Sequence, residues 1–177
     1  MPSAVLMIFF NKKNQTHLVY IRRTKGMNLH SGQMAFPGGK IDPEDESSYA
    51  TAVRETFEEI GVDAHLCTYL GKMGFFETLT SGYDAAVHLV WCPEPQKYKI
   101  NQNEVAEVVE IPVATLLEQF QPDLDFDNPQ EIMYLNFRYQ LKTTSEVVIL
   151  WGLTARITHH FMQGLSEFFR IFKRNSR

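Results

Sequence analysis

The sequence predicts an α/β (α+β) fold, an α/β/α sandwich whose mixed central sheet lies between helices. Strand-like and helix-like segments follow one another along the chain in an order that suits this architecture. No internal repeat or interdomain linker interrupts them, and 44% of the 177 residues are hydrophobic. A chain of this length and composition can bury a substantial core. We therefore expect residues 1–177 to form a single domain.

The first elements are predicted to be strands at 3–10 and 17–22, because both segments are rich in β-branched and aromatic residues. The polar segment 11–16 is expected to form the turn between them. The apolar run at the N-terminus lacks a preceding basic region and is too short to span a bilayer, so we interpret it as a buried strand rather than a signal sequence. A short strand is expected within 32–39.

A helix is predicted next, from about Glu46 to Ile60, with Asp45 as its N-cap and Gly61 just after its end. At about 100° per residue, three carboxylates of this helix fall within an arc of roughly 100°. These residues are Glu55, Glu58 and Glu59. The opposite side carries an apolar set that we expect to be buried, namely Tyr49, Val53, Phe57 and Ile60.

The second half of the chain is expected to continue the alternation of strands and helices. Strands are predicted at 65–76, 85–91 and 104–111. Pro112 is expected to open a helix that ends near Phe120. Residues 121–130 are expected to form an acidic loop. A hairpin is then predicted from 132–141 and 147–150, followed by a helix from about 154 to 173.

Charge and cysteine content limit the partners that we expect. The formal net charge of −4 gives no electrostatic footprint for nucleic acid, and we expect neither nucleic acid nor membrane as a partner. Neither Cys67 nor Cys92 lies in a zinc-like or redox-like spacing. We therefore expect free thiols in a reducing, cytoplasmic location.

The stretch from Gly38 to Val62 resembles the Nudix box, G-x5-E-x7-R-E-U-x-E-E-x-G-U, in which U is an apolar residue. Counting backward from Arg54 puts Glu46 at the first glutamate of the box. Gly39 then lies one residue too far upstream, and Thr56 stands at an aliphatic position. The remaining positions match as spaced, so we interpret the chain as similar to the Nudix hydrolases.

The irregular spacing resembles the coenzyme A pyrophosphatase branch of this family, which has the same extra residue and an aspartate at the place of Asp45. An upstream signature of that branch matches Arg23 and Gly32 and ends at the Phe36–Gly39 segment. Asn28 departs from it, because the branch has a second arginine there. Later segments, including 104–112 and 151–155, also look like landmarks of this branch.

The resemblance implies a hydrolase that uses Mg²⁺ or Mn²⁺ to cleave a diphosphate. Glu55 and Glu59 are the strongest expected metal ligands, with Glu58 close behind and the carbonyl of Gly39 as a further ligand. Arg54 is expected to orient the box glutamates and is grouped with Glu58 and Glu59 as catalytic. The general base is left open between Glu58, Glu59 and a distal acid, either Glu104 or Glu107.

Substrate contacts are expected from the segment before the box and from one distant tyrosine. Arg23 and the turn residue Gly38 are expected near substrate phosphate. Phe36 and Tyr83 are candidates for stacking on a base, with core packing as the alternative for Phe36. The terminal helix alternates aromatic and basic residues, and we expect its aromatic side to pack on its own domain or on a second subunit of a homodimer.

Three functional hypotheses follow. The first is a hydrolase that cleaves the diphosphate of a nucleoside diphosphate linked to another group, coenzyme A or acyl-coenzyme A in the reading that the resemblance favours. The second is a Nudix hydrolase for ADP-ribose, a dinucleotide or a nucleoside triphosphate. The third is a non-catalytic nucleotide-binding module, although the retained glutamates favour an enzyme.

Overall fold

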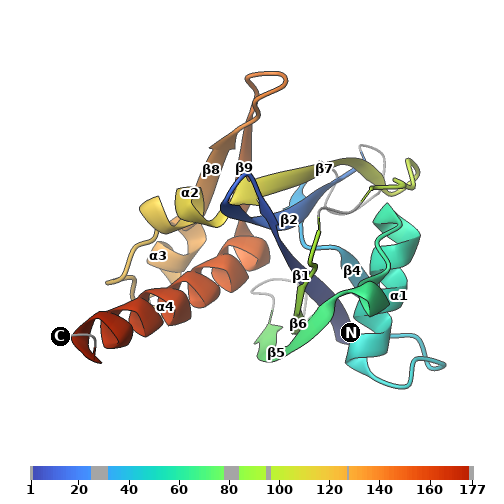
Figure 1. Cartoon of the computed structure of the whole chain (residues 1–177), viewed down its shortest axis with the longest axis horizontal. Coiled ribbons are helices and arrows are strands. Elements are labelled where there is room, and N and C mark those ends of the chain that lie inside the picture. Colours follow the sequence, from blue (N-terminus) through green and yellow to red (C-terminus); the bar gives the residue numbers. More distant parts are fainter. Residues whose placement is uncertain (1, 25–31, 78–83, 95–96, 127, 176–177) are drawn as a thin grey trace.

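A mixed β-sheet separates two hydrophobic clusters, with helices packed over both of its faces (Figure 1). The computed structural model describes residues 2–24, 32–77, 84–94, 97–126 and 128–175. This arrangement confirms the predicted α/β sandwich with a mixed central sheet.

Within the described residues, seven strands form the main sheet. They are β1 (Pro2–Lys12), β2 (Gln15–Arg23), β3 (Met34–Ala35), β4 (Gly38–Lys40), β5 (Thr68–Glu77), β6 (Asp84–Trp91) and β7 (Val105–Pro112). The order is β3-β2-β1-β6-β5, while β4 pairs with β1 and β7 pairs with β2. The β1–β6 pair is parallel and the other pairs are antiparallel, which makes the sheet mixed.

Strand β1 lies at the centre because its side chains are apolar on both faces of the sheet. Leu6, Ile8 and Phe10 belong to the cluster under helix α1 (Ser48–Ile60). The alternate residues Met7 and Phe9 belong to the cluster on the other face. The two-residue period of a strand thus supplies both cores from one segment.

The second face is covered by the C-terminal part of the chain. Its elements are α2 (Val113–Glu118), α3 (Pro129–Tyr134), the hairpin β8 (Asn136–Gln140) and β9 (Val147–Trp151), and α4 (Gly152–Asn175). Figure 1 shows α4 on the opposite side of the sheet from α1. A short 3₁₀ helix, η1 (Ala64–Leu66), joins the α1 side of the molecule to β5.

Helix α1 begins two residues later than the sequence predicts. Ser47 is the N-cap, because its side chain accepts a hydrogen bond from the backbone N–H of Ala50. The expected N-cap Asp45 is therefore wrong. Gly61 ends the helix as expected, in the left-handed conformation with φ of 69°, and its N–H donates to the carbonyl of Phe57.

The buried side of α1 also differs from the expected one. Phe57 is 58% exposed, whereas the acidic residue Glu59 is only 1% exposed. The helix rests on β1 and β4 through a side that carries small, apolar and acidic residues. These buried residues are Thr51, Ala52, Val53, Thr56, Glu59 and Ile60.

Two other predicted segments need correction. The strand expected from residue 132 begins only at Asn136, because Pro129–Tyr134 forms helix α3 with Asn128 as its N-cap. The short strand expected within 32–39 is divided into β3 and β4.

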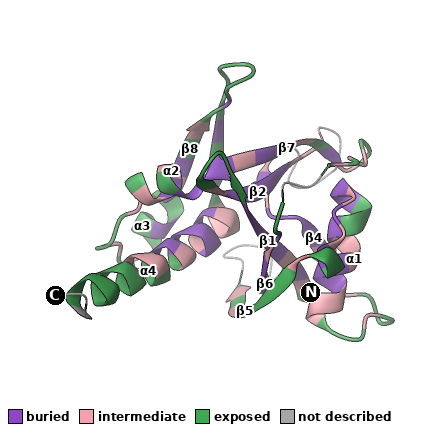
Figure 2. Ribbon diagram, viewed as in Figure 1, coloured by how far each residue is buried: buried purple, intermediate pink, exposed green. Residues whose placement is uncertain are grey.

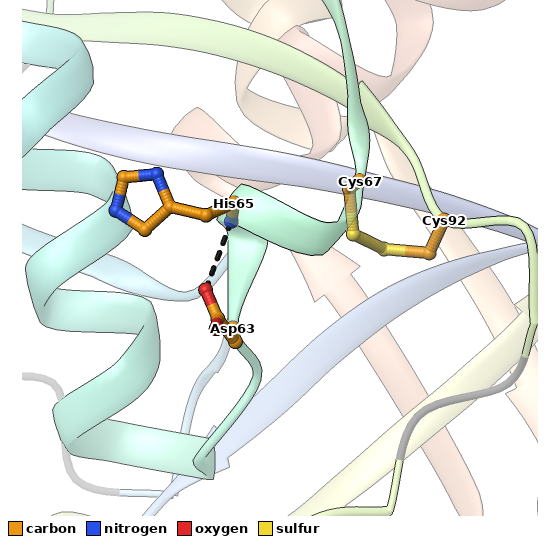
Figure 3. Close-up of a disulfide and its surroundings, with 4 residues drawn as sticks. All are labelled: Asp63, His65, Cys67 and Cys92. Atoms are coloured by element: carbon orange, nitrogen blue, oxygen red, sulfur yellow. Dashed lines mark hydrogen bonds between the residues drawn. A yellow bond between two sulfur atoms is a disulfide. The ribbon is translucent and has the colours of Figure 1, made fainter.

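The two cysteines form a disulfide, so the expectation of free thiols is wrong (Figure 3). Cys67 comes directly before β5 and Cys92 directly after β6. The register of these two strands pairs Thr68 with Trp91, so it brings the flanking cysteines together. In the described part of the chain, no helix combines the length and the low polarity needed to cross a bilayer.

Reduction of the disulfide is expected to lower the free energy of unfolding by about 3 kcal/mol, because the bond closes a loop of moderate length in the unfolded chain. Urea unfolding with and without dithiothreitol measures this difference. A Cys67→Ser/Cys92→Ser double variant is the control, since reductant should leave its midpoint unchanged. An unchanged wild-type midpoint, with thiol titration confirming reduction, would contradict the assignment.

Candidate active site

The candidate site lies where α1 faces the end of β2, the turn at β4 and the residue that precedes β7. Glu59, near the end of α1, accepts a hydrogen bond from the backbone N–H of Gly38 at 2.9 Å. Arg23, the last residue of β2, places its Nη1 atom 3.5 Å from the same carboxylate. Three segments that are distant in the sequence therefore meet at one buried carboxylate.

Arg54 organises the acidic groups on the outer side of this site. It donates to both carboxylate oxygens of Asp45, through Nε and Nη2 at 3.0 Å each. Its Nη1 atom donates to Glu55 at 3.1 Å and to Glu58 at 3.2 Å. Nη2 also donates to the carbonyl of Lys40 at 3.3 Å. The side chain thus holds two box glutamates and anchors them to the preceding loop.

Asp45 is the acidic partner of Arg54, and not Glu46, which the count backward from Arg54 places at the first glutamate of the box. Asp45 also accepts from the hydroxyl of Thr51 at 2.8 Å and from the backbone N–H of Asp42 at 2.9 Å. Hydrogen bonding from Arg54 holds the pKa of Asp45 well below its usual range. Glu46 is exposed instead. The G-x5-E spacing of the box, counted forward from Gly39, ends at Asp45, so the sequence itself indicates this residue.

Two glycines make the close approach of the loop and α1 feasible. Gly38 has φ of +142°, and a Cβ there would lie 2.2 Å from the carbonyl oxygen of Ala4. At Gly39 a Cβ would lie 2.4 Å from the carboxyl carbon of Glu55. The carboxylate of Glu55 therefore rests directly against the backbone of Gly39.

Burial and neighbouring acids raise the pKa values of Glu55 and Glu59. Burial raises the pKa of Glu59 to about 7, opposed by the Gly38 N–H and Arg23 and reinforced by Glu55 and Glu104. Burial likewise raises the pKa of Glu55, opposed by Arg54 and reinforced by Glu58 and Glu104. Glu104 thus lies close enough to both residues to act on them. A positive charge placed among these groups would relieve their repulsion.

The donor set fits a hard divalent cation, because it consists of carboxylate oxygens beside a backbone turn. Among the described residues, however, no three His, Cys, Asp or Glu side chains are already arranged to hold a metal ion. The three box glutamates are instead engaged in hydrogen bonds, Glu55 and Glu58 with Arg54 and Glu59 with the N–H of Gly38. Each of these carboxylates keeps a second oxygen that could bind a cation, and a change in the hydrogen bonds of Arg54 could bring them closer together.

The other predicted site residues lie in the core, in another ion pair or outside the described residues. Phe36 is 3% exposed and packs against Tyr20 in the core, so its predicted stacking on a base is replaced by core packing. Glu107 pairs with Arg22 at 2.7 Å, which engages it away from Glu55 and Glu59. Thr56, at the aliphatic position of the motif, is fully buried. Tyr83 and Asn28 lie outside the described residues.

Comparison with known proteins identifies similar sequences over most of the chain. The family model described as NUDIX domain matches residues 1–135. A protein of Yersinia pestis (strain Pestoides F), named "Uncharacterized Nudix hydrolase NudL", is 34% identical over 167 residues. The match covers 93% of this chain and 79% of that protein.

Solved structures with the same fold include two that were determined with a ligand or as a complex. A C. elegans Ap4A hydrolase in a binary complex has a TM-score of 0.54 at 16% identity, covering 66% of this chain and 83% of that one. The NUDIX domain of Shewanella oneidensis NrtR, complexed with ADP ribose, has a TM-score of 0.54 at 22% identity, covering 67% and 76%. At these identities the likeness concerns the fold.

Replacing Asp45 by Asn should lower the stability of the protein at pH 7. The folded-state pKa of Asp45 lies below the value of about 4 expected in the unfolded chain. Its ionised form therefore adds stability above about pH 4, and that stability is lost as the pH falls through the folded-state pKa. The difference in the free energy of unfolding between wild type and Asp45→Asn should thus become smaller below pH 4.

Urea unfolding at several pH values measures this effect. Glu44→Gln, an exposed acid in the same loop, is the matched control and should show no such deficit. Equal stability of Asp45→Asn and wild type at pH 7 would show that Arg54 is not held through Asp45.

Proposed function

Because this chain belongs to the Nudix hydrolase family, whose members cleave phosphoanhydride bonds, we propose that it hydrolyses the diphosphate of coenzyme A or of acyl-coenzyme A. One observation carries the proposal of an active enzyme. The carboxylates of Glu55 and Glu59 are packed against the Gly38–Gly39 turn, where burial raises the pKa of both and nearby Glu104 raises it further. A fold that served only to bind nucleotide would not need this destabilising concentration of acid.

The residues that would hold the divalent cation are Glu55, Glu58 and Glu59, with the carbonyl of Gly39 as a backbone ligand. Bound Mg²⁺ or Mn²⁺ would neutralise diphosphate oxygens and lower the pKa of an attacking water. Both ions prefer oxygen ligands, and cellular availability decides between them.

The side chains of this protein have distinct tasks in the proposed reaction. Arg54 fixes the positions of Glu55 and Glu58 through Asp45, so it is a positioning residue. Arg23 lies beside Glu59 and offers a guanidinium to substrate phosphate. Glu58 is exposed, and Glu104 is partly exposed, so either can accept a proton from water in the open site.

Support for coenzyme A comes from the branch-specific features of the sequence. The extra residue in the box and Asp45 occur together in that branch, and here Asp45 has a definite role as the partner of Arg54. Arg23, also part of the signature, lies beside Glu59. The upstream signature therefore converges on the same acidic site as the box itself. A cytoplasmic location remains a prediction.

Replacing Glu59 by Gln should test whether this residue binds the metal ion, because the variant is expected to keep the fold. The pKa of Glu59 is raised to about 7, above the value of about 4.3 in the unfolded chain. The stability linked to this raised pKa is present below about pH 4 and is lost as the pH rises through 7. Above pH 7 the metal-free wild type therefore buries an ionised carboxylate that the variant lacks.

We expect metal-free Glu59→Gln to be more stable than metal-free wild type at pH 8, by roughly 1–3 kcal/mol. Mg²⁺ should stabilise only the wild type, and kcat should fall by about 10²–10³-fold in the variant. Thermal unfolding and turnover assays measure these effects. Glu46→Gln, an exposed glutamate near the start of the same helix, should change neither. Retained turnover and Mg²⁺ stabilisation in Glu59→Gln would refute the metal assignment.

A substrate panel tests the proposed chemistry directly. With Mg²⁺ or Mn²⁺ present, coenzyme A should be cleaved to 3′,5′-ADP and a phosphopantetheine product. Its kcat/KM should exceed that of ADP-ribose, dinucleotides and nucleoside triphosphates by about tenfold or more. A higher kcat/KM for any of these would assign the enzyme to the other substrate class. Tight binding without turnover of any compound would instead indicate a non-catalytic module.

A further inference from the structure

The C-terminal half of α4 carries large apolar side chains that are about half exposed or more. Phe168, Phe169, Ile171 and Phe172 are 61%, 46%, 51% and 61% exposed. Figure 2 shows this half of the helix as exposed, and Figure 1 shows it extending away from the sheet toward the C-terminus. Of the two expected partners of this aromatic side, the described part of the protein's own domain therefore leaves these residues exposed, and packing on a second subunit stays a prediction.

The exposed residues continue a stripe that is partly buried closer to the sheet. Phe161, Leu165, Phe168 and Phe172 recur at spacings of four, three and four residues, so they lie on one side of the helix. Phe161 and Leu165 pack against the core cluster on this face of the sheet. Beyond Leu165 the residues of the same stripe, Phe168 and Phe172, are more exposed.

A hollow of about 300 Å³ lies beside this stripe, between α4 and strands β5 and β6. Its apolar walls include Leu70, Met73, Leu89 and Phe161, and Gly164 also lines it. A Cβ added to Gly164 would meet no atom within 4 Å, so the glycine leaves space on the helix surface. The hollow is large enough for one aromatic side chain.

Along α4, residues beside the hollow and exposed apolar residues occur at equal spacings before and after Phe168. Gly164 lies four residues before Phe168, and Phe172 lies four residues after it. Leu165 and Ile171 are likewise three residues before and after. Two antiparallel copies of α4 that cross at Phe168 would therefore set Phe172 of each copy against Gly164 of the other. Such reciprocity is what a two-fold symmetric interface requires.

From this placement we infer that the stripe Phe161–Phe172 and the adjoining hollow form a homodimer interface, in which Phe172 of each copy fills the hollow of the other. The four exposed side chains offer roughly 400 Å² per copy, at about 200 Å² for a whole aromatic side chain. With the walls of the hollow, two copies bury on the order of 1,000 Å², the lower range for specific association. The dimer is accordingly weak and concentration-dependent.

The charges on α4 favour a second copy over a lipid surface. The basic residues Arg170, Lys173 and Arg174 lie on the side of the helix opposite Phe168 and Phe172. With the aromatic side inserted in a bilayer, most of this positive charge would point away from the lipid headgroups. In an antiparallel helix pair the same residues stay in water. The chain's net charge of −4 further opposes an anionic membrane.

Sedimentation velocity across micromolar to submillimolar concentrations tests the interface. Wild type should shift from monomer toward dimer as concentration rises. Gly164→Leu fills the hollow while improving helix propensity, so it should fold normally and weaken self-association by about tenfold or more. Phe172→Ser should do the same. Arg174→Ser, on the opposite side of the same helix end, should dimerise like wild type.

A wild type that stays monomeric throughout, or variants Gly164→Leu and Phe172→Ser that associate like wild type, would overturn the interface. Oxidative cross-linking gives a second readout, since both native cysteines are already paired. Phe168→Cys, at the proposed two-fold axis, should form a covalent dimer, and Arg170→Cys should not. Equal cross-linking of both variants, or sedimentation of wild type with phosphatidylglycerol vesicles that Phe172→Ser abolishes, would also overturn the proposal.

Discussion

The paired hydrogen bonds between Arg54 and Asp45 are the interaction on which the geometry of the acidic site depends. Both carboxylate oxygens of Asp45 are engaged, so the guanidinium plane is fixed and its remaining Nη1 atom is directed at Glu55 and Glu58. Asp45 is itself held by the hydroxyl of Thr51, one helical turn into α1. Without this anchor, two neighbouring carboxylates on one helix would repel each other and turn toward water.

A second constraint comes from the backbone, because the loop before α1 can approach the helix only where side chains are absent. Gly38 gives its N–H to Glu59, and Gly39 leaves room for the carboxylate of Glu55. Packing of this loop against α1 buries Glu59, and the burial raises its pKa despite the opposing hydrogen bond from Gly38, so the folded protein holds a carboxylate that favours either a proton or a nearby cation. The close packing of the Gly38–Gly39 loop on α1 therefore also creates a site that favours positive charge.

Much of this arrangement could be predicted from sequence because it depends on local periodicity. The spacing of the three glutamates places them on one side of a helix, and Gly61 ends that helix as its freedom to adopt positive φ suggests. Other features depend on how distant segments meet. The Cys67–Cys92 bond follows from the register of β5 and β6, which no local pattern specifies. That Asp45, rather than Glu46, pairs with Arg54 depends on the path of the loop, although the G-x5-E spacing counted from Gly39 indicates Asp45.

The central claim is that Glu55, Glu58 and Glu59 converge on a divalent cation beside the Gly38–Gly39 turn. Anomalous diffraction at the manganese edge, from crystals soaked in Mn²⁺, tests it most directly. The account predicts an anomalous peak at about 2.0–2.3 Å from carboxylate oxygens of these glutamates and from the Gly39 carbonyl, with Arg54 released from Glu55. A peak elsewhere, or none with the hydrogen bonds of Arg54 unchanged, would contradict it.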